Sequence, residues 1–569
     1  MKRRFLSIFM VIALCFVCIF AISGCDFINS GNGGNGDGIQ GEILEISLNE
    51  TSLTLSEGRS ETLVATVKLK IDGVELTVKT NNSDQAVNVN VEWESSDTSV
   101  ATVENGNVST IKEGTANITA KAGSKSATCD LTVKHYEPVD FEMPEGGYDG
   151  SKVTITFANT TGQDKARIIE EAIEDFNELY PNITVLVDNS IKSYDELSKR
   201  ILTELVSGKQ PNVAFCYPDH VALYNRANAV VAIDDFLSDG QFKNMTVTNS
   251  AGVEPLGLTQ AQQNDYVQAF FDEGSVYGDG HTYTLPFAKS TEVMYYNKDF
   301  FDEHHLTVPA TWDEMETVCK QIQGIIGKKN GKYPLGYDSD ANLFITMCEQ
   351  YNSPYISATG DHFLFDNAKN QEFVKDLVDL YNDDCLITQS TNNDRYVSNL
   401  FTQENCFMSI GSSAGSSYHY ADFNIGVAPI PQVDISNPKS TLQGPSVCIF
   451  RDENPQEVLA SWLFVKFLTT DVQLQCRYSE ASGYMPVTKS AYNNEIYQEY
   501  LSATSLPART AKLCAELEKR NVFFTTPAFV GSSKAYEQVG LLMKTALLGG
   551  NIEEAFKQAV DACNLYIAN

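Results

Sequence analysis

The sequence predicts an α/β protein of two lobes, preceded by an all-β sandwich and by an export segment. Three observations support this prediction. Short segments with alternating apolar residues fill residues 42–134, strands and amphipathic helices alternate from residue 151, and 419 residues run from 151 to 569. One sheet does not normally organise so many residues, so we expect two lobes in the second part.

Residues 1–24 have the layout of a cleavable export signal. Three basic residues at positions 2–4 precede an apolar run over residues 5–22, and a small residue, Gly24, stands before Cys25. The tetrapeptide ending at Cys25 resembles a bacterial lipobox, which implies a lipoprotein signal peptide and lipidation of Cys25. The alternative is an uncleaved anchor, because the apolar run could just span a bilayer. Both alternatives place the remainder on the extracellular face of the cytoplasmic membrane.

Residues 25–41 are rich in glycine and asparagine and predict a flexible tether. Residues 42–134 then show period-two alternation with turn residues between the segments, which is typical of an all-β sandwich. The expected strands are Ile43–Leu48, Ser52–Leu55, Thr62–Val67, Val89–Glu94, Val100–Val103, Ala116–Ala120 and Ala127–Val133.

The segment around Trp93 resembles the bacterial group 2 immunoglobulin-like domain, through Val91–Val103 together with Gly114–Ala120. The resemblance implies that Trp93 lies in the core, with a ligand-stacking Trp93 as the alternative. Cys129 has no cysteine partner in this segment, so we expect no disulfide between the sheets. Relative to that family, residues 70–88 resemble an inserted hairpin.

Residues 135–150 carry two prolines and three glycines and predict a linker. A βαβαβ run follows, because strand patterns alternate with amphipathic helices that end at Pro181 and Gly208. The expected elements are strands at 152–158, 183–187 and 212–216, with helices through Ile168–Leu179 and Leu197–Leu205. Helices and short strands continue to residue 569.

Composition excludes several partners. The formal net charge of −33 disfavours nucleic acid and anionic lipid, which bind basic patches. The cysteines beyond Cys25 are scattered singly, without disulfide or zinc spacing, so most are expected to be small core residues. We therefore expect no metal and no cofactor.

Enzyme motifs are weak. Gly411–Gly415 matches the G-x-S-x-G elbow of hydrolases, but only His419 follows it, too near to be the distant member of a triad. His304 and His305 are adjacent and lack zinc-binding spacing. A glycosidase needs only two carboxylates and stays open, but we expect no enzyme.

Four stretches resemble the extracellular solute-binding proteins of ABC importers, in the family that handles sugars and glycerol-3-phosphate. The resemblance implies a two-lobe, type II periplasmic-binding-protein-like fold that closes on a ligand and delivers it to a permease. The stretches are the opening βαβαβ run, Leu285–Lys298 with Pro309–Glu314, Phe401–Gly415 and Gly483–Thr488.

Several ligand contacts of the glycerol-3-phosphate branch carry over. The branch's arginine falls near Phe529, and its tryptophan near Asp340, so both are missing here. Without that arginine a phosphate loses a bidentate partner, so the resemblance favours a neutral sugar or oligosaccharide over glycerol-3-phosphate or a glycerophosphodiester. The carried-over residues are Tyr194, Asp219, Ser290, Ser412, Ser413, Gly444 and Tyr484, of which Asp219 lies one position away from the family's acidic contact.

Each of these residues has a structural alternative. The two tyrosines could be packing residues, and the serines could cap the helices that follow them. For the whole chain, the resemblance implies a monomer that contacts a carbohydrate, ABC permease subunits and, through the lipid on Cys25, the membrane. A surface glycan-binding adhesin is the alternative of another class, although the immunoglobulin-like segment occurs once and fits a stalk.

Overall fold

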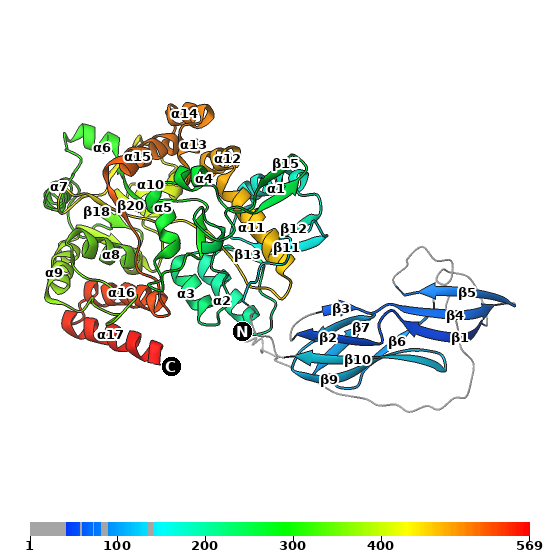
Figure 1. The fold of residues 1–569 in the computed structure, drawn as a ribbon. Coiled ribbons are helices and arrows are strands. Elements are labelled where there is room, and N and C mark those ends of the chain that lie inside the picture. Colours follow the sequence, from blue (N-terminus) through cyan, green and yellow to red (C-terminus); the bar gives the residue numbers. More distant parts are fainter. Residues whose placement is uncertain (1–40, 57–59, 72, 81–88, 135–139, 569) are drawn as a thin grey trace, which may run out of the picture. The chain divides into compact units, whose positions relative to one another are not determined.

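The computed structural model describes residues 41–56, 60–71, 73–80, 89–134 and 140–568. The predicted signal peptide, Cys25 and the tether up to residue 40 lie outside the described residues, as does the start of the predicted linker. The chain divides into two compact units, Met1–Tyr136 and Glu137–Asn569. Figure 1 shows the elements of both units, and each unit is described by itself.

The first unit consists of strands in three sheets, with orders β1-β4-β5, β2-β10-β9-β6 and β3-β8-β7. Alternation drives the packing: along β10, Cys129, Leu131 and Val133 are buried while the residues between them are exposed. The strands are β1 Gly41–Leu48, β2 Ser52–Ser56, β3 Ser60–Thr62, β4 Ala65–Ile71, β5 Val74–Lys79, β6 Glu92–Ser95, β7 Ala101–Glu104, β8 Asn107–Thr110, β9 Gly114–Ala122 and β10 Lys125–Lys134.

Two details of this unit differ from the sequence interpretation. Strand β8 was not predicted, although Asn105-Gly106, with φ of 51° and 88°, turns the chain from β7 into it. An Asn-Gly pair with two positive φ angles is the usual two-residue hairpin loop, so the signal was present. Trp93 is half-buried rather than fully buried and contacts both apolar cores of the unit.

The second unit contains two five-stranded sheets, and we call the part built on each sheet a lobe. Lobe 1 has the strand order β12-β11-β13-β23-β16. Its first three strands are parallel and are joined by helices α1 and α2, which confirms the predicted βαβαβ run (Figure 1). The elements are β11 Val153–Ala158, α1 Gln163–Leu179, β12 Ile183–Asp188, α2 Tyr194–Leu205, β13 Val213–Cys216, β16 Thr284–Pro286 and β23 Ser446–Ile449.

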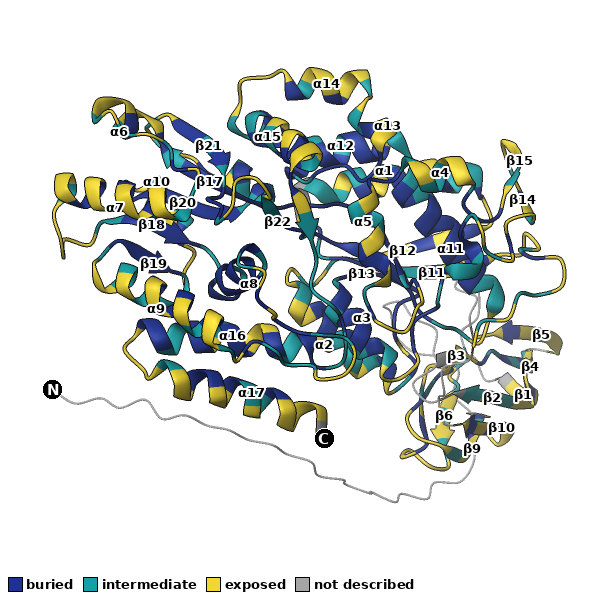
Figure 2. Ribbon diagram, turned by 60° about the vertical axis from the view of Figure 1, so that its left-hand side comes forward, coloured by how far each residue is buried: buried dark blue, intermediate teal, exposed yellow. Residues whose placement is uncertain are grey.

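Lobe 2 has the order β19-β18-β20-β17-β21 and its own apolar core. Figure 2 shows its strands mostly buried, while helices α9 and α17 are exposed on their outer faces. The elements are β17 Glu292–Asn297, α7 Trp312–Ile326, β18 Tyr333–Tyr337, α8 Asp340–Gln350, α9 Ala368–Asn382, β19 Leu386–Thr388, β20 Cys406–Ser412, β21 Ile425–Pro429, α16 Ser532–Leu547 and α17 Ile552–Ala568.

The chain passes between the lobes in segments that lie side by side. Residues 287–291 lead from β16 to β17, and residues 430–445 lead from β21 to β23. The backbone amide of Ser290 donates to Gln443 O at 2.8 Å, and that of Gln443 donates to Ser290 O at 2.9 Å. Strand β22 (Lys439–Thr441) also pairs in parallel with β24 (Val522–Phe524), which precedes α16. We call these paired crossing segments, residues 287–291 and 430–445, the joint.

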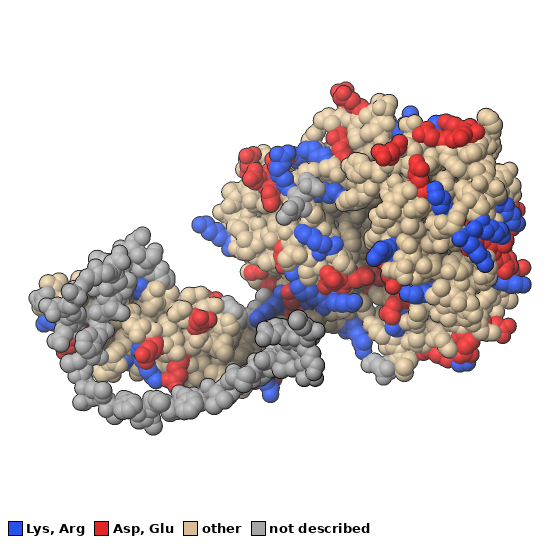
Figure 3. Space-filling view, turned by 180° about the vertical axis from the view of Figure 1, so that it is seen from behind, with Lys and Arg blue, Asp and Glu red and all other residues tan. Residues whose placement is uncertain are grey.

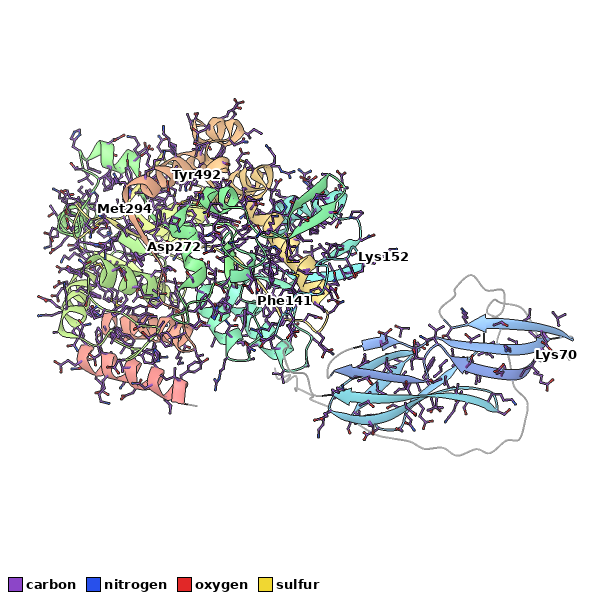
Figure 4. The ribbon with its side chains drawn as sticks, in the orientation of Figure 1. Lys70, Phe141, Lys152, Asp272, Met294 and Tyr492 are labelled. Carbon is purple, nitrogen blue, oxygen red and sulfur yellow. The ribbon has the colours of Figure 1, made fainter. Side chains whose placement is uncertain are left out.

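Helices of lobe 1 bury aromatic residues beneath the sheet. Trp462 of α11 stacks on Phe236 with ring centroids 4.6 Å apart, and its indole N–H donates to Leu256 O at 2.8 Å. Phe141, labelled in Figure 4, packs against Phe236 and Phe242 and so fixes the start of the unit on this lobe.

The remaining elements of the second unit are α3 Pro218–Asn225, β14 Thr246–Asn249, β15 Gly252–Pro255, α4 Gln260–Asp265, α5 Gln268–Asp272, α6 Lys298–Glu303, α10 Ser398–Thr402, α11 Pro455–Thr470, α12 Val472–Ser482, α13 Lys489–Tyr492, α14 Glu495–Leu501 and α15 Leu506–Arg520. Its 3₁₀ turns are η1 Asp234–Phe236, η2 Glu273–Ser275, η3 Ser390–Asn392 and η4 Ser413–Tyr418.

The ten cysteines within the described residues are all buried and free, as predicted. Residues Tyr295 and Tyr296 point to opposite faces of β17, but both rings pack, Tyr295 in the lobe 1 core and Tyr296 against the lobe 2 core. None of the helices that the structure describes is long and apolar enough to cross a membrane. On the face of the second unit drawn in Figure 3, acidic and basic side chains are interspersed.

Candidate functional site

The carboxyl ends of the parallel strands in lobe 1 carry aromatic and hydroxyl groups. Tyr194 begins α2 after β12, and Tyr217 follows β13 directly. Their rings meet edge to face with centroids 5.0 Å apart. Ser193 holds the start of α2, since its hydroxyl accepts from the Glu196 amide. Ligands of open α/β sheets bind outside such strand ends, so this pair marks a candidate site.

Tyr484 joins the two phenols from another part of the chain. It follows Gly483, whose φ of 75° ends α12, and its ring stacks on Tyr478 with centroids 6.4 Å apart. Burial raises the pKa of Tyr484, and a hydrogen bond with the Tyr194 side chain opposes this rise. Burial also raises the pKa of Tyr194. Both hydroxyls therefore stay protonated near neutral pH, and the one that accepts in their mutual hydrogen bond keeps its O–H for a ligand oxygen.

Gly444 occupies a position that only glycine fits. Its φ is 98°, and a Cβ built there would lie 2.3 Å from Ala288 O. Its amide donates to the Tyr217 hydroxyl at 3.3 Å. The predicted residues Tyr194, Gly444 and Tyr484 are thus brought together through Tyr217, from three separate segments.

The three predicted serines lie where the crossing segments meet β20. The Ser412 hydroxyl donates to Ser290 Oγ at 3.4 Å and accepts from the Ala414 amide, so it caps the 3₁₀ turn η4. Ser413 is fully buried, and its hydroxyl and amide both engage the Thr291 backbone. The capping alternative therefore holds for Ser412, whereas Ser290 caps no helix.

Asp219 lies at a different edge, between the lobes. It stands in the first turn of α3, and its Oδ2 accepts from the Ser533 hydroxyl of α16 at 2.8 Å. It therefore links lobe 1 to lobe 2 beside the tyrosine cluster, two residues from Tyr217.

Glu292 adjoins the candidate site and was not predicted from the sequence. It begins β17 opposite Ser412, is 2% exposed, and accepts hydrogen bonds from the Tyr337 and Thr346 hydroxyls. Burial raises the pKa of its carboxyl to about 7, against these hydrogen bonds. An acidic residue just ahead of the apolar run of a strand was the available signal. Tyr217 was also missed, although a residue directly after a parallel strand is a natural ligand contact.

Carboxylates dominate the charge around Tyr536 of α16. Its hydroxyl is hydrogen-bonded to Ser339 Oγ at 3.2 Å and to Asn342 Oδ1 at 3.0 Å. Burial raises the pKa of Tyr536 to about 12, and the charges of Glu292, Asp219 and Asp195 contribute to this rise. These three carboxyl groups therefore place negative charge near Tyr536.

Two lysines adjoin the cluster. Lys289 is fully buried and ion-paired with Glu273. Lys192 is exposed, and its ammonium donates to Thr161 O at 3.1 Å. At the position near which the resemblance places an arginine, Phe529 stacks on His362 with centroids 4.4 Å apart and an interplanar angle of 17°. An aromatic stack cannot provide the bidentate donors that a phosphate prefers.

The hydrolase motif lacks its base. The ring of His419 stacks on Tyr295 with centroids 3.9 Å apart, and its Nδ1 is 3.0 Å from Gly415 O. Among the residues that the structure describes, its Nε2 has no hydrogen-bond partner. The histidine is thus a packing residue and does not activate Ser412 or Ser413.

A separate cavity of about 390 Å³ lies among α13, α14 and α15. Tyr492, labelled in Figure 4, is one of its lining residues, and none of the predicted site residues lines it.

Comparisons with known proteins agree with this architecture. The profile of the family described as bacterial extracellular solute-binding protein matches residues 171–504. The sn-glycerol-3-phosphate-binding periplasmic protein of Rhizobium meliloti (strain 1021) is 27% identical over 228 residues, which cover 38% of this chain and 51% of that protein. The chain thus spans about half the length of this relative and of the same-named protein of Brucella abortus (strain 2308).

Solved structures show the same fold at low sequence identity. UgpB from Mycobacterium tuberculosis, in complex with glycerophosphocholine, has a TM-score of 0.59 and 18% identity, covering 73% of this chain and 98% of that one. The GacH receptor of Streptomyces glaucescens, solved unliganded and with acarbose, has a TM-score of 0.56 and 18% identity, with 73% and 97% covered. The predicted two-lobe α/β fold is thereby confirmed. Because the family profile matches more than half of its residues, this chain belongs to the bacterial extracellular solute-binding proteins.

Proposed function

We propose that this protein is the solute receptor of an ABC importer and that it binds a neutral sugar or oligosaccharide between its two lobes. The observation that carries this proposal is the meeting of Tyr194, Tyr217, Gly444 and Tyr484 beside the joint where the chain crosses between the lobes. Phenols and backbone amides are donors suited to hydroxyl groups, and tyrosine faces suit the apolar faces of sugar rings.

The electrostatics favour a neutral ligand over a phosphate. Glu292, Asp219 and Asp195 all act on Tyr536, and an aromatic stack at Phe529 replaces the expected arginine. An anionic group in this field gains no charge-assisted bidentate partner and is repelled by the carboxylates. Lys192 is the exposed lysine beside the cluster through which glycerol-3-phosphate or a glycerophosphodiester could still bind.

A thermal-shift screen tests the ligand class. The whole chain is heated with monosaccharides, maltotriose, glycerol-3-phosphate and glycerophosphocholine, each at several concentrations. A ligand that binds only the folded state raises the melting temperature, and at about 100 times its Kd it contributes about 2.7 kcal/mol. We expect stabilisation by a neutral saccharide and none by the two phosphates.

If only the two phosphates raise the melting temperature, the ligand is a glycerophosphate and not a neutral sugar. In that case Lys192→Met should abolish the shift, with Lys165→Met as a matched control on α1. Slow hydrolysis of a glycoside, lost on Glu292→Gln, would revive the enzyme alternative. Binding only to polymeric glycans would favour an adhesin.

The membrane anchor is part of the same proposal. We infer that lipid on Cys25 and the tether hold the receptor near its permease, with the strand-rich first unit as a spacer. Cys25→Ser is expected to move the protein from the membrane fraction to the medium. If the variant stays in the membrane fraction, the segment over residues 5–22 is an uncleaved anchor instead.

A further inference from the structure

Lys289 is an unusual residue to find in the interior of the second unit. Its side chain is 0% exposed, and that of its partner Glu273 is 1% exposed. Replacing a buried ion pair with apolar residues is often neutral or stabilising, so such a pair is weak evidence of a role in stability. The position of this pair in the molecule suggests a different role.

All three ammonium hydrogens of Lys289 have acceptors. The ammonium donates to Glu273 Oε2, to Gly444 O at 3.0 Å and to Ser446 Oγ at 2.9 Å. Ser446 in turn donates to Glu273 Oε2 at 2.8 Å. A lysine has three donors and no acceptor, so this network is complete. It fixes the carbonyl of Gly444 while the amide of the same residue donates to the Tyr217 hydroxyl.

The backbone of Lys289 holds a second segment of the candidate site. Its amide donates to Met485 O at 3.1 Å, and the Met485 amide donates back to Lys289 O at 2.5 Å. Met485 is the chain neighbour of Tyr484. The next residue, Ser290, pairs with Gln443 through both backbone groups. Segments 288–291, 443–446 and 484–486 therefore converge on one residue.

We propose that Lys289 is the positioning residue of the candidate solute site, with Glu273 as its buried counter-ion. This inference rests on the proposed function. Lys289 holds Gly444 and Met485 at a common point, and so sets the spacing between the Gly444 amide, Tyr217 and Tyr484. An apolar side chain of similar length could fill the same volume, but it could not hold the Gly444 carbonyl.

The test separates positioning from stability by removing both charges together. The single variant Lys289→Met leaves Glu273 charged and buried, so it can fail for lack of folding. The double variant Lys289→Met/Glu273→Gln leaves no unpaired charge and keeps an acceptor for Ser446. Ser446→Ala is the milder alternative, because it removes only the hydroxyl between the two charged groups.

Hydrogen–deuterium exchange of the whole chain without ligand is the first readout. In the double variant we expect peptides covering 441–446 and 484–488 to exchange about tenfold faster, while the strands β11 and β13 exchange as in the wild type. Lys466→Met/Glu254→Gln is the matched control. Lys466 is also buried in lobe 1, donates to Pro255 O and lies 3.6 Å from Glu254, away from these segments.

Unchanged exchange at 441–446 and 484–488 in the double variant and in Ser446→Ala would overturn the proposal. The second readout is the affinity for the saccharide that gives the largest thermal shift, expected to fall at least about tenfold in the double variant and to stay unchanged in the control. Faster exchange with unchanged affinity would also overturn it. Because exchange needs no ligand, a failure to find any saccharide ligand would count against the proposed function and leave the positioning result readable.

Discussion

The two lobes differ in the partners of their buried ionisable groups. In lobe 1, the buried charges of Lys289 and Glu273 beside the candidate site are paired with each other, and the buried ring of His220 lies 3.5 Å from the exposed carboxylate of Asp195. In lobe 2, the carboxyls of Glu292 and Asp338 are held by neutral donors, namely hydroxyls and backbone amides. The lobe 1 network needs its charges in order to hold the backbone together. Burial raises the pKa of both lobe 2 carboxyls, and the hydrogen bonds that they accept oppose this rise.

Removing the lobe 1 cation should have the largest effect on stability. Lys289→Met leaves the Glu273 carboxylate buried and unpaired, which is expected to cost about 3–5 kcal/mol of unfolding free energy. Urea denaturation followed by tyrosine and tryptophan fluorescence measures this loss. A loss below about 1 kcal/mol would mean that the pair does not carry charge, and would remove the contrast between the lobes.

Removing the Glu292 carboxyl of lobe 2 should raise the free energy of unfolding, and the size of this effect should depend on pH. The native pKa of Glu292 is about 7, above the ordinary 4.5, so the folded state holds the proton more tightly than the unfolded state. Stability therefore falls as pH rises from about 4.5 to 7 and is constant above that range. Glu292→Gln should stabilise the protein by up to about 3 kcal/mol at pH 8 and by less than about 1 kcal/mol at pH 5.

Denaturation of wild type and Glu292→Gln at the two pH values checks this difference. An equal effect of the substitution at pH 5 and pH 8 would show that Glu292 is ionised in the folded protein at both. Both lobes would then contain buried groups that are charged in the folded protein.

Gly444→Ala tests the backbone that the lobe 1 network holds. The added Cβ would meet Ala288 O and the φ of 98° would be strained, so we expect a loss of about 1–3 kcal/mol and weaker saccharide binding. Gly549→Ala is the matched control, since Gly549 has a φ of 91° but open space around its Cβ position. Calorimetric titration should show weaker binding for Gly444→Ala alone. Equal effects of the two substitutions on stability and binding would show that Gly444 is required only for its positive φ, and not for the space at its Cβ position.

The smallest effect is expected for Tyr217→Phe, which removes the acceptor of the Gly444 amide. The expected loss is about 1 kcal/mol, the usual net value of one neutral hydrogen bond. Tyr500→Phe serves as a comparison, because the Tyr500 hydroxyl is buried and has no hydrogen-bond partner among the described residues. Thermal melts should separate the two variants, and identical melting temperatures would show that the Tyr217–Gly444 bond contributes nothing.

Local pattern was sufficient to predict much of the fold. The helices α1 and α2 and the strands around them follow from apolar periodicity and from stops at Pro181 and Gly208, whose φ is 65°. The helix that begins at Trp312 has an equally local signal, because Thr311 forms a capping box with Glu314. These features are encoded within a few neighbouring residues, so one sequence reveals them.

The centre of the candidate site could not be predicted in the same way. Lys289 meets Gly444 and Ser446 across 155 and 157 residues of sequence, and meets Met485 across a still longer stretch. Nothing near Lys289 in the sequence marks it as different from a surface lysine. Residues such as Tyr194 and Tyr484 were named only because they match a family pattern, and their role in binding stays a prediction.

Hydrogen–deuterium exchange with and without a saturating saccharide is the most direct test of where the solute binds. We expect protection of the segments containing Tyr217, Ser290, Gly444 and Tyr484, and none in the strand-rich first unit. Protection confined to α13, α14 and α15, around the cavity of about 390 Å³, would contradict it and move the site to that surface.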